Sequence, residues 1–487
     1  MPVKSVFLPL TRLWLNGGRG VVALALTVAL AWAYAQTFLR EFPSTVEIRQ
    51  PHEMELRHLA MTTETRKDLA LDFSRGVSEP LNNWLPHRTD GVVRPLWPWL
   101  AAWLVDASQG QSAVLSPRFA RQVHLLKLSF SLSVLVLLGL ACARAFSVPA
   151  AALTVFLVGF GVWLPSSRFF LPDLLFSVLF LLTWITCIAA LKRNSLWLHG
   201  AIGFLAALAN LTAPTATPLM LVFVGVSTLR WMWGWIVGHF APGGGTTLWV
   251  RRNHWLGLLL LGVCHVITVG PMMSFAQQKL GDATPFHWRW FENSDEMRAW
   301  TRTHQTPDVL RAVPEEKVPS IENYRATHTT EEIRGRLKSG AFALVKEVLG
   351  FDWSRGCSRG SFAAAFGGLL VLLVLVLLFM APRAHHAGQA LHPETAPIVL
   401  FTVLALVVCT FDFGWDMPVL DSGSRPLAIY GPFILSLVWA CEALIHRVRR
   451  RQMRLPVLFL YELTLWLLCA AAAWWLIAFL QPTSSTA

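Results

Sequence analysis

Three short stretches of polar residues stand next to apolar segments and carry groups that could do chemistry at a membrane surface. The stretch VEIRQPHEMELRHLAM contains Glu53 and Glu55, and a carboxylate of this kind can take a proton from a hydroxyl group. Asp173 opens an apolar segment, with Arg168 nearby. Arg425 precedes another apolar segment, and a guanidinium there can hold a phosphate through two parallel hydrogen bonds.

Each of these residues also has a structural interpretation. Asp173 follows Pro172 and fits a helix N-cap aspartate that the helix dipole favours. Arg425 fits a lipid headgroup anchor. The segment TDGVVRPLWPWLAAWLV, with Asp90 and Arg94, reads either as an interfacial helix that supports a site or as a plain juxtamembrane helix. The residues alone leave both interpretations open.

Other classes of site have no support in the sequence. The histidines form no pair with metal-ligand spacing, so we expect no zinc site. Of the 7 cysteines, Cys357 alone falls in a long polar loop, and no disulfide framework follows. A phosphate-cradling glycine loop, a nucleophile elbow and an HExxH motif are all missing. We expect no cofactor, and the sequence leaves a divalent-metal requirement open.

The composition explains where these groups must sit. Hydrophobic residues make up 54% of the 487 residues and charged residues 14%, whereas about 25% are charged in soluble domains. The net charge of +12 is spread over the loops, and its densest run, at 447–454, lies beside an apolar segment. That placement indicates a cytoplasmic anchor under the positive-inside rule. It argues against a nucleic-acid partner.

The apolar segments predict an all-α integral membrane fold. A helix needs about 20 apolar residues to cross the hydrocarbon, and fewer when neighbouring helices shield it. This length predicts about eleven transmembrane helices. They cover residues 21–38, 123–143, 148–163, 174–191, 196–211, 218–235, 255–273, 361–380, 396–411, 427–445 and 455–480.

Basic residues in the short loops predict the orientation. With a cytoplasmic N-terminus, the inner loops carry Arg144, Lys192, Arg193, Arg230, Arg251, Arg252, Arg383 and the cluster at 447–454. The C-terminus is then extracytoplasmic, as are two long polar segments. We divide the chain into an N-terminal membrane module (1–273) with its first outer loop (39–95), a second long loop (274–360) that contains a helix-like stretch at 331–349, and C-terminal membrane helices (361–487).

Three of these regions, taken in order, resemble motifs of one enzyme family. HEMELRHLAM (52–61) and RPLWPWLAAWL (94–104) are similar to an acidic stretch and a following "R-x-PLYPLLLAL" segment. FLPDLLFSVLFLL (170–182) and GAIGFLAALANLTAPTATPLM (200–220) are similar to a "PD-x-L" span and a "GLA-x-LTKPT" turn. SRPLAIYGPFILSL (424–437) is similar to a late "RY-x-x-P-x-x-P" segment. The family is the GT-C superfamily of polytopic glycosyltransferases, with the bacterial lipid-A sugar transferases and the dolichyl- or polyprenyl-phosphate-mannose protein mannosyltransferases.

The resemblance implies a reaction and roles for the residues. One sugar would pass from a polyprenyl-phosphate donor to a hydroxyl of a glycan, lipid or protein acceptor on the extracytoplasmic side. Glu53 would act as base, with Glu55 as the second candidate, and Asp173 would position the acceptor or the base. Arg425, with Arg168 and Arg94, would hold the phosphate, and Asp90 belongs to the same substrate-binding group. The implied location is a bacterial inner membrane.

The chain also departs from the family's motifs. His52 stands where the acidic stretch begins with aspartate, and Ala213 replaces the lysine of "LTKPT". Three other functions therefore stay open: a transporter or flippase of lipid-linked saccharides, an enzyme like the O-antigen ligases or polymerases, and a catalytically inactive scaffold.

Overall fold

The computed structural model describes residues 18–41, 96–97, 100, 104, 117–164, 173–212, 216–240, 248–280, 321–348, 396–415, 428–450 and 455–480. Within these ranges the secondary structure is helical, without a strand. Six of the described helices are long and apolar enough to cross a membrane. The chain is therefore an all-α protein with the character of a membrane protein.

The helices match the predicted segments closely. They are α2 (Gly18–Glu41), α5 (Pro117–Ala145), α6 (Val148–Val158) with its π-helical continuation η2 (Gly159–Trp163), α8 (Asp173–Arg193), α9 (Leu196–Thr212), α10 (Thr217–Phe240), α11 (Leu248–Leu280), α15 (Ile321–Thr327), α16 (Thr330–Val348), α18 (Ala396–Gly414), α19 (Tyr430–Arg450) and α20 (Leu455–Leu480). The six span candidates are α2, α5, α8, α10, α11 and α18. Each predicted span coincides with a helix except 361–380, which lies outside the described residues.

Local sequence explains where many helices begin and end. Proline stands in the first turn of α5, α6, α10, α18 and α20, where its missing N–H costs no hydrogen bond. Lys192 and Arg193 close α8, and Arg230 of α10 donates to the carbonyl of Leu191 in its last turn. Cations at this position satisfy terminal carbonyls and match the helix dipole.

Aromatic side chains show how α8 and α18 pack side by side in opposite directions. The rings of Phe176 and Phe413 lie 5.9 Å apart, and those of Trp184 and Phe401 lie 5.2 Å apart. The start of α8 therefore lies beside the end of α18. Elsewhere, α9 and α11 approach so closely that a Cβ on Gly203 would collide with the carbonyl of Leu261.

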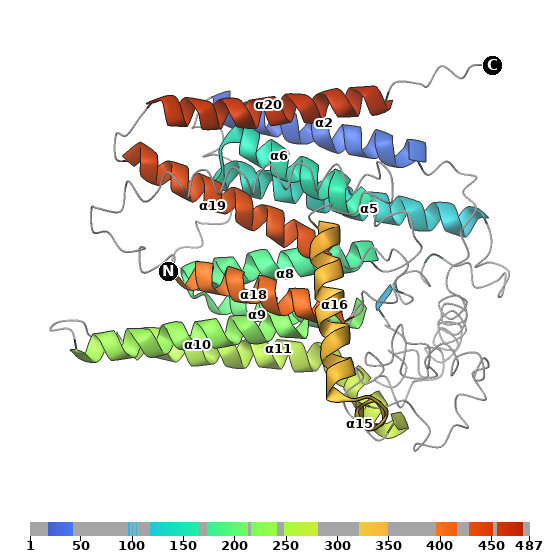
Figure 1. Cartoon of the computed structure of the whole chain (residues 1–487), viewed down its shortest axis with the longest axis vertical. Helices are drawn as coiled ribbons and strands as arrows, with labels where there is room; N and C mark the ends of the chain where they lie inside the picture. Colours follow the sequence, from blue (N-terminus) through green and yellow to red (C-terminus); the bar gives the residue numbers. More distant parts are fainter. Residues whose placement is uncertain are drawn as a thin grey trace, which may run out of the picture.

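The long helices run roughly parallel, and α16 runs across them (Figure 1). α10 and α19 finish, and α11 and α20 start, at one end of the bundle, while α15 and α16 lie toward the other. We call the first the basic end, because α8 finishes there with Lys192 and Arg193 and α19 with Arg447, Arg449 and Arg450. We call the second the α16 end. Which end faces the cytoplasm stays a prediction.

Candidate functional site

Asp173 is the one predicted site residue that falls within the described parts of the chain. Glu53, Glu55, Asp90, Arg94, Arg168 and Arg425 lie outside the described residues, and so does Ala213. The site is therefore built here from Asp173 and from the polar groups that the described helices bring to the same end of the bundle.

Asp173 is the first residue of α8 and is only 1% exposed. Its backbone carbonyl accepts a hydrogen bond of 2.7 Å from Ser177 Oγ, and Phe176, one turn further on, packs on Phe413. The carboxylate thus lies at the α16 end. A negative charge is favoured there by the helix dipole, and an ionisable group buried in a membrane helix is a candidate for function.

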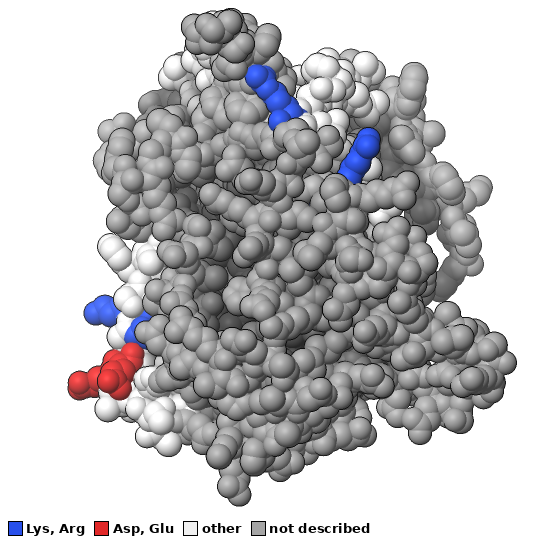
Figure 2. Space-filling view, turned by 90° about the vertical axis from the view of Figure 1, so that its right-hand side faces the viewer, with Lys and Arg blue, Asp and Glu red and all other residues white. Residues whose placement is uncertain are grey.

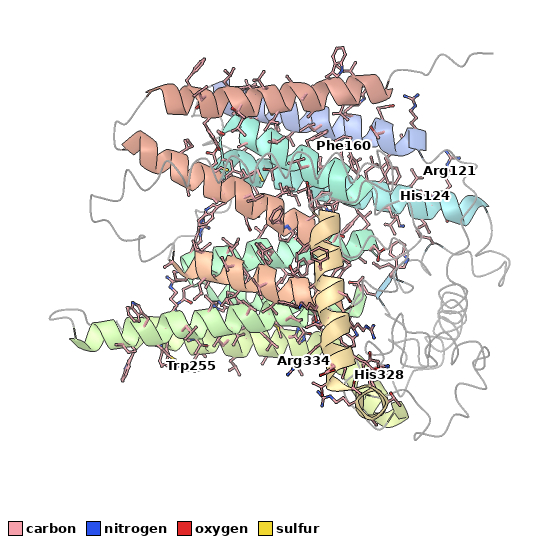
Figure 3. The ribbon with its side chains drawn as sticks, viewed as in Figure 1. Arg121, His124, Phe160, Trp255, His328 and Arg334 are labelled. Atoms are coloured by element: carbon pink, nitrogen blue, oxygen red, sulfur yellow. The ribbon has the colours of Figure 1, made fainter. Side chains whose placement is uncertain are left out.

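A buried cation lies on α5 toward the same end. Lys127 is 2% exposed, and its Nζ lies 5.2 Å from the ring centroid of Trp97, within the range of a cation–π interaction. His124, one turn earlier, packs edge-on against Phe38 at 6.4 Å. Figure 3 shows Arg121 and His124 toward the end where Arg334 and His328 lie, with Trp255 toward the other.

Trp97 belongs to the segment for which an interfacial or juxtamembrane helix is predicted. It is buried, with the Lys127 ammonium group over its ring. Lys127 itself could have been noticed in the sequence, because it is an ionisable residue inside a predicted span.

The turn between α9 and α10 is held by a buried amide. Asn210 donates from Nδ2 to Thr217 Oγ1 at 2.9 Å, and its Oδ1 accepts from the backbone N–H of Ala216 at 3.0 Å. These two bonds close the segment that resembles the "LTKPT" turn, of which residues 213–215 lie outside the described parts. The turn is at the α16 end, since α9 runs back along α8 from the basic end.

Arg336 fastens α16 to the end of α18. Its guanidinium donates from Nε to the carbonyl of Trp415 at 3.2 Å and from one Nη to Tyr324 Oη at 3.0 Å. It also lies 4.1 Å from the Trp415 ring centroid and 5.8 Å from that of Tyr324. His328 stacks on Tyr324 at 4.0 Å. We call Tyr324, His328, Arg336 and Trp415 the aromatic clamp.

Two further features fix α16. At its start, Thr329 donates from its backbone N–H and its hydroxyl to the Glu332 carboxylate at 2.7 and 2.9 Å, while the Glu332 N–H donates back to Thr329 Oγ1. This is a capping box, and its hydrogen bonds hold the pKa of Glu332 below its ordinary value of 4.5. In its middle, a Cβ on Gly340 would collide with the carbonyl of Gly414, so the two backbones touch directly.

The basic end contains a second buried carboxylate with a different setting. Glu442 of α19 accepts hydrogen bonds from Ser147 Oγ at 2.6 Å, from the Ser147 N–H at 3.3 Å and from Tyr461 Oη at 2.9 Å. Ser147 is the N-cap residue of α6, so this one carboxylate joins α6, α19 and α20. We interpret it as structural, and the sequence analysis had not singled it out.

The α16 end thus combines a buried carboxylate, a buried ammonium group and a set of aromatic rings. A carboxylate can accept or orient a proton, a cation can balance phosphate charge, and rings can pack on the apolar faces of a sugar or on lipid chains. Among the described residues, no group of three or more His, Cys, Asp or Glu is placed to hold a metal ion.

Searches against protein-family models and curated proteins find no match for this chain.

Proposed function

We propose that the chain is a polytopic glycosyltransferase of the GT-C type, which moves one sugar from a polyprenyl-phosphate donor to an acceptor hydroxyl on the extracytoplasmic side of a bacterial inner membrane. The observation that carries the proposal is the burial of Asp173, the first residue of α8, and of Lys127, one turn after His124, toward the end of the bundle that α16 crosses. The order of the family-like motifs along the chain supports it independently.

The proposed topology follows from the same picture. About eleven helices cross the bilayer, the N-terminus and the basic end are cytoplasmic, and the α16 end and the C-terminus are extracytoplasmic. The basic residues that close α8 and α19 at one end support this orientation. A lipid-linked donor then reaches the site from the side, through the bilayer.

The reaction requires a base and an electrostatic partner for the leaving group. Glu53, or Glu55 in its place, takes the proton from the acceptor hydroxyl as the oxygen attacks the anomeric carbon of the sugar. The bond from that carbon to the phosphate oxygen breaks, and the electron pair leaves with the carrier phosphate. Arg425, Arg168 and Arg94 steady the growing negative charge.

Asp173, Lys127 and Asp90 have supporting roles in this scheme. Asp173 orients the acceptor or the base, and Asp90 belongs to the substrate-binding group. Lys127 adds a buried positive charge toward the α16 end, where the carrier phosphate would arrive. A cation in a site from which water is excluded interacts with a phosphate much more strongly than it does in water.

The test is mass spectrometry of lipid-linked sugars and surface glycans from cells with and without the protein. An added single sugar that depends on the protein supports the proposal. Transfer of a whole glycan from a diphosphate carrier indicates a ligase or polymerase, and movement of an unmodified lipid-linked saccharide across vesicles indicates a transporter. If the protein changes neither the lipid-linked sugars, nor the surface glycans, nor saccharide movement across vesicles, the result indicates a catalytically inactive scaffold.

Single substitutions then test the residue roles. Glu53→Gln or Glu55→Gln should lower the transfer rate about 10²- to 10⁴-fold for whichever is the base. Asp173→Asn should also lower the rate, and Lys127→Gln should raise the KM for the donor. Glu331→Gln, an exposed carboxylate on α16, is the matched control. If Glu53→Gln and Glu55→Gln both keep full transfer, the assignment of the base is wrong.

A further inference from the structure

The outward face of α16 carries both cations and large apolar side chains. Phe342 is 72% exposed and Val345 is 41% exposed, and Arg334 and Lys338 are exposed as well. At about 100° per residue, these four side chains fall within an arc of about 80° on the helix. Leu344 and Gly340, which lie about 120° and 160° from the middle of this arc, are buried against the bundle. The helix is therefore amphipathic in an unusual way, since part of its exposed face is apolar.

The place of α16 along α18 sets its depth. Val399, Val403, Val407 and Phe411 form an exposed apolar stripe on α18, as expected for a helix that faces lipid. The stripe would continue at Gly414 and Trp415, but α16 covers these two residues. Three residues of helix rise by about 4.5 Å. The middle of α16, at Arg336 and Gly340, therefore lies where the exposed apolar stripe of α18 ends. In a bilayer, the end of a lipid-facing stripe corresponds to the level of the headgroups.

The direction of the exposed face fits the same level. In Figure 1, α16 lies in front of the bundle and crosses the long helices instead of standing beyond their ends. Figure 2 looks along the bundle onto the α16 end, and acidic and basic side chains project from its left flank, where α16 lies. These side chains thus point sideways, within the plane of a surrounding bilayer.

We propose that α16 lies in the headgroup layer at the α16 end of the bundle and binds anionic phospholipid there, with Arg334 and Lys338 on lipid phosphates and Phe342 and Val345 among the upper acyl chains. Charge complementarity supports this occupant, because a basic residue near an anionic membrane surface attracts it appreciably. Glu331 and Glu332 stand in the first turn, and Glu332 is used by the capping box. The two cations follow one and two turns later.

The inference does not depend on glycosyl transfer. It requires only that the bundle sits in a bilayer. In that case α16 fixes the position of the aromatic clamp along the bilayer normal. A carrier phosphate that travels in the headgroup layer would arrive at the same height, but the test below contains no such carrier.

The test places an environment-sensitive nitrobenzoxadiazole dye at Phe342→Cys in the full chain, reconstituted in nanodiscs. Quenching by lipids with a nitroxide at the headgroup, or at a shallow or deep acyl position, reports its depth. Wild-type protein treated with the same dye gives the background from native cysteines. Glu331→Cys, on the same face of α16 but in its first turn, is the control position.

Three results are expected. The dye at position 342 should be quenched most by the shallow acyl nitroxide and little by iodide in the water, whereas the dye at position 331 should show the reverse. Anionic phosphatidylglycerol should blue-shift the emission at 342 relative to phosphatidylcholine. The double substitution Arg334→Gln and Lys338→Gln should abolish that lipid dependence, at about fivefold in lipid preference for each charge removed.

Other results overturn the proposal. Strong iodide quenching at 342 in both lipids means that the face is in water. Protection from both iodide and lipid nitroxides means that protein, from this chain or a second copy, covers it. A lipid dependence that survives the double substitution means that Arg334 and Lys338 do not bind the anionic lipid. Circular dichroism of each variant confirms that the helices have formed before quenching is interpreted.

Discussion

Replacing Arg336 with alanine should release α16 from the bundle without unfolding the membrane helices. The substitution removes two hydrogen bonds from a cation, one to the Trp415 carbonyl at 3.2 Å and one to Tyr324 Oη at 3.0 Å. It also removes the cation from the Trp415 ring at 4.1 Å. The Trp415 carbonyl and the Tyr324 hydroxyl each lose a donor that protein geometry had supplied.

The size of the effect follows from these contacts. Hydrogen bonds that involve a charged group contribute about 1.5–3 kcal/mol each in favourable settings, and a cation–π contact adds about 0.5–2 kcal/mol. The guanidinium recovers part of this sum when water solvates it, because Arg336 is only partly buried. We therefore expect a local loss of about 2–3 kcal/mol, which is roughly a 30- to 150-fold rise in the opening equilibrium of α16.

Hydrogen–deuterium exchange in nanodiscs measures this opening directly, because exchange of protected amides reports local free energies of opening. Amides of α16 should exchange faster by that factor, while those of α8 and α18 should not change. Arg336→Lys keeps the charge but not the forked geometry, so its effect should be intermediate. Glu331→Gln, five residues earlier and exposed, is the control.

Two outcomes would refute the reasoning. Exchange of α16 within twofold of the wild type would mean that the clamp does not hold the helix. An equal acceleration in α8 and α18 would mean that Arg336 stabilises the whole bundle, so that α16 is no separate unit.

Three further perturbations probe the packing around the site and the fold. Gly340→Ala should destabilise α16 docking by about 1–3 kcal/mol because its Cβ meets the backbone of α18, whereas Gly335→Ala, with nothing within 4 Å, should stabilise α16 slightly; proteolysis of the loop ends compares them. Glu442→Gln should lower thermal stability in detergent by about 1–3 kcal/mol, since a buried donor loses its acceptor, while exposed Glu462→Gln should change it by under about 0.5 kcal/mol. The pKa of Glu332 is held below 4.5, so its cap is intact above that pH and is lost as the pH falls through the lowered pKa. The protection factors of amides in the first turn of α16, which correct for the intrinsic pH dependence of exchange, should therefore fall on acidification, and Glu332→Gln should remove that change.

The membrane helices could be located from the sequence because each one satisfies its own backbone hydrogen bonds. In lipid, an apolar run of sufficient length has few alternatives to a helix, and predicted segments such as 396–411 and 455–480 coincide with α18 and α20. The amphipathic stretch at 331–349 is likewise a helix, α16. Its start follows from the Thr329–Glu332 capping box, a local signal four residues long.

The packing of these helices could not be read in the same way. Arg336 meets the carbonyl of Trp415 across 79 positions of the chain, and Ser147 meets Glu442 across 295. Such pairs depend on which helices become neighbours, and apolar runs carry little information on that. Lys127 was missed for a related reason, because a single cation in a long apolar run leaves the run recognisable as a span.

Burial alone does not separate a functional carboxylate from a structural one in this protein. Glu442 and Asp173 are both buried, and both lie close to a helix N-terminus. Glu442, from within α19, contacts the start of α6, and Asp173 is the first residue of α8. The Glu442 carboxylate accepts hydrogen bonds from Ser147 and Tyr461, and these account for its position because they join three helices at the basic end. Asp173 opens α8 beside the end of α18, where α16 docks, and Lys127 follows one turn after His124, which Figure 3 shows toward that end. Placement, not depth of burial, is therefore the reason to assign Asp173 to chemistry. The two substitutions Asp173→Asn and Glu442→Gln should accordingly differ in kind, the first lowering transfer in a stable protein and the second lowering stability.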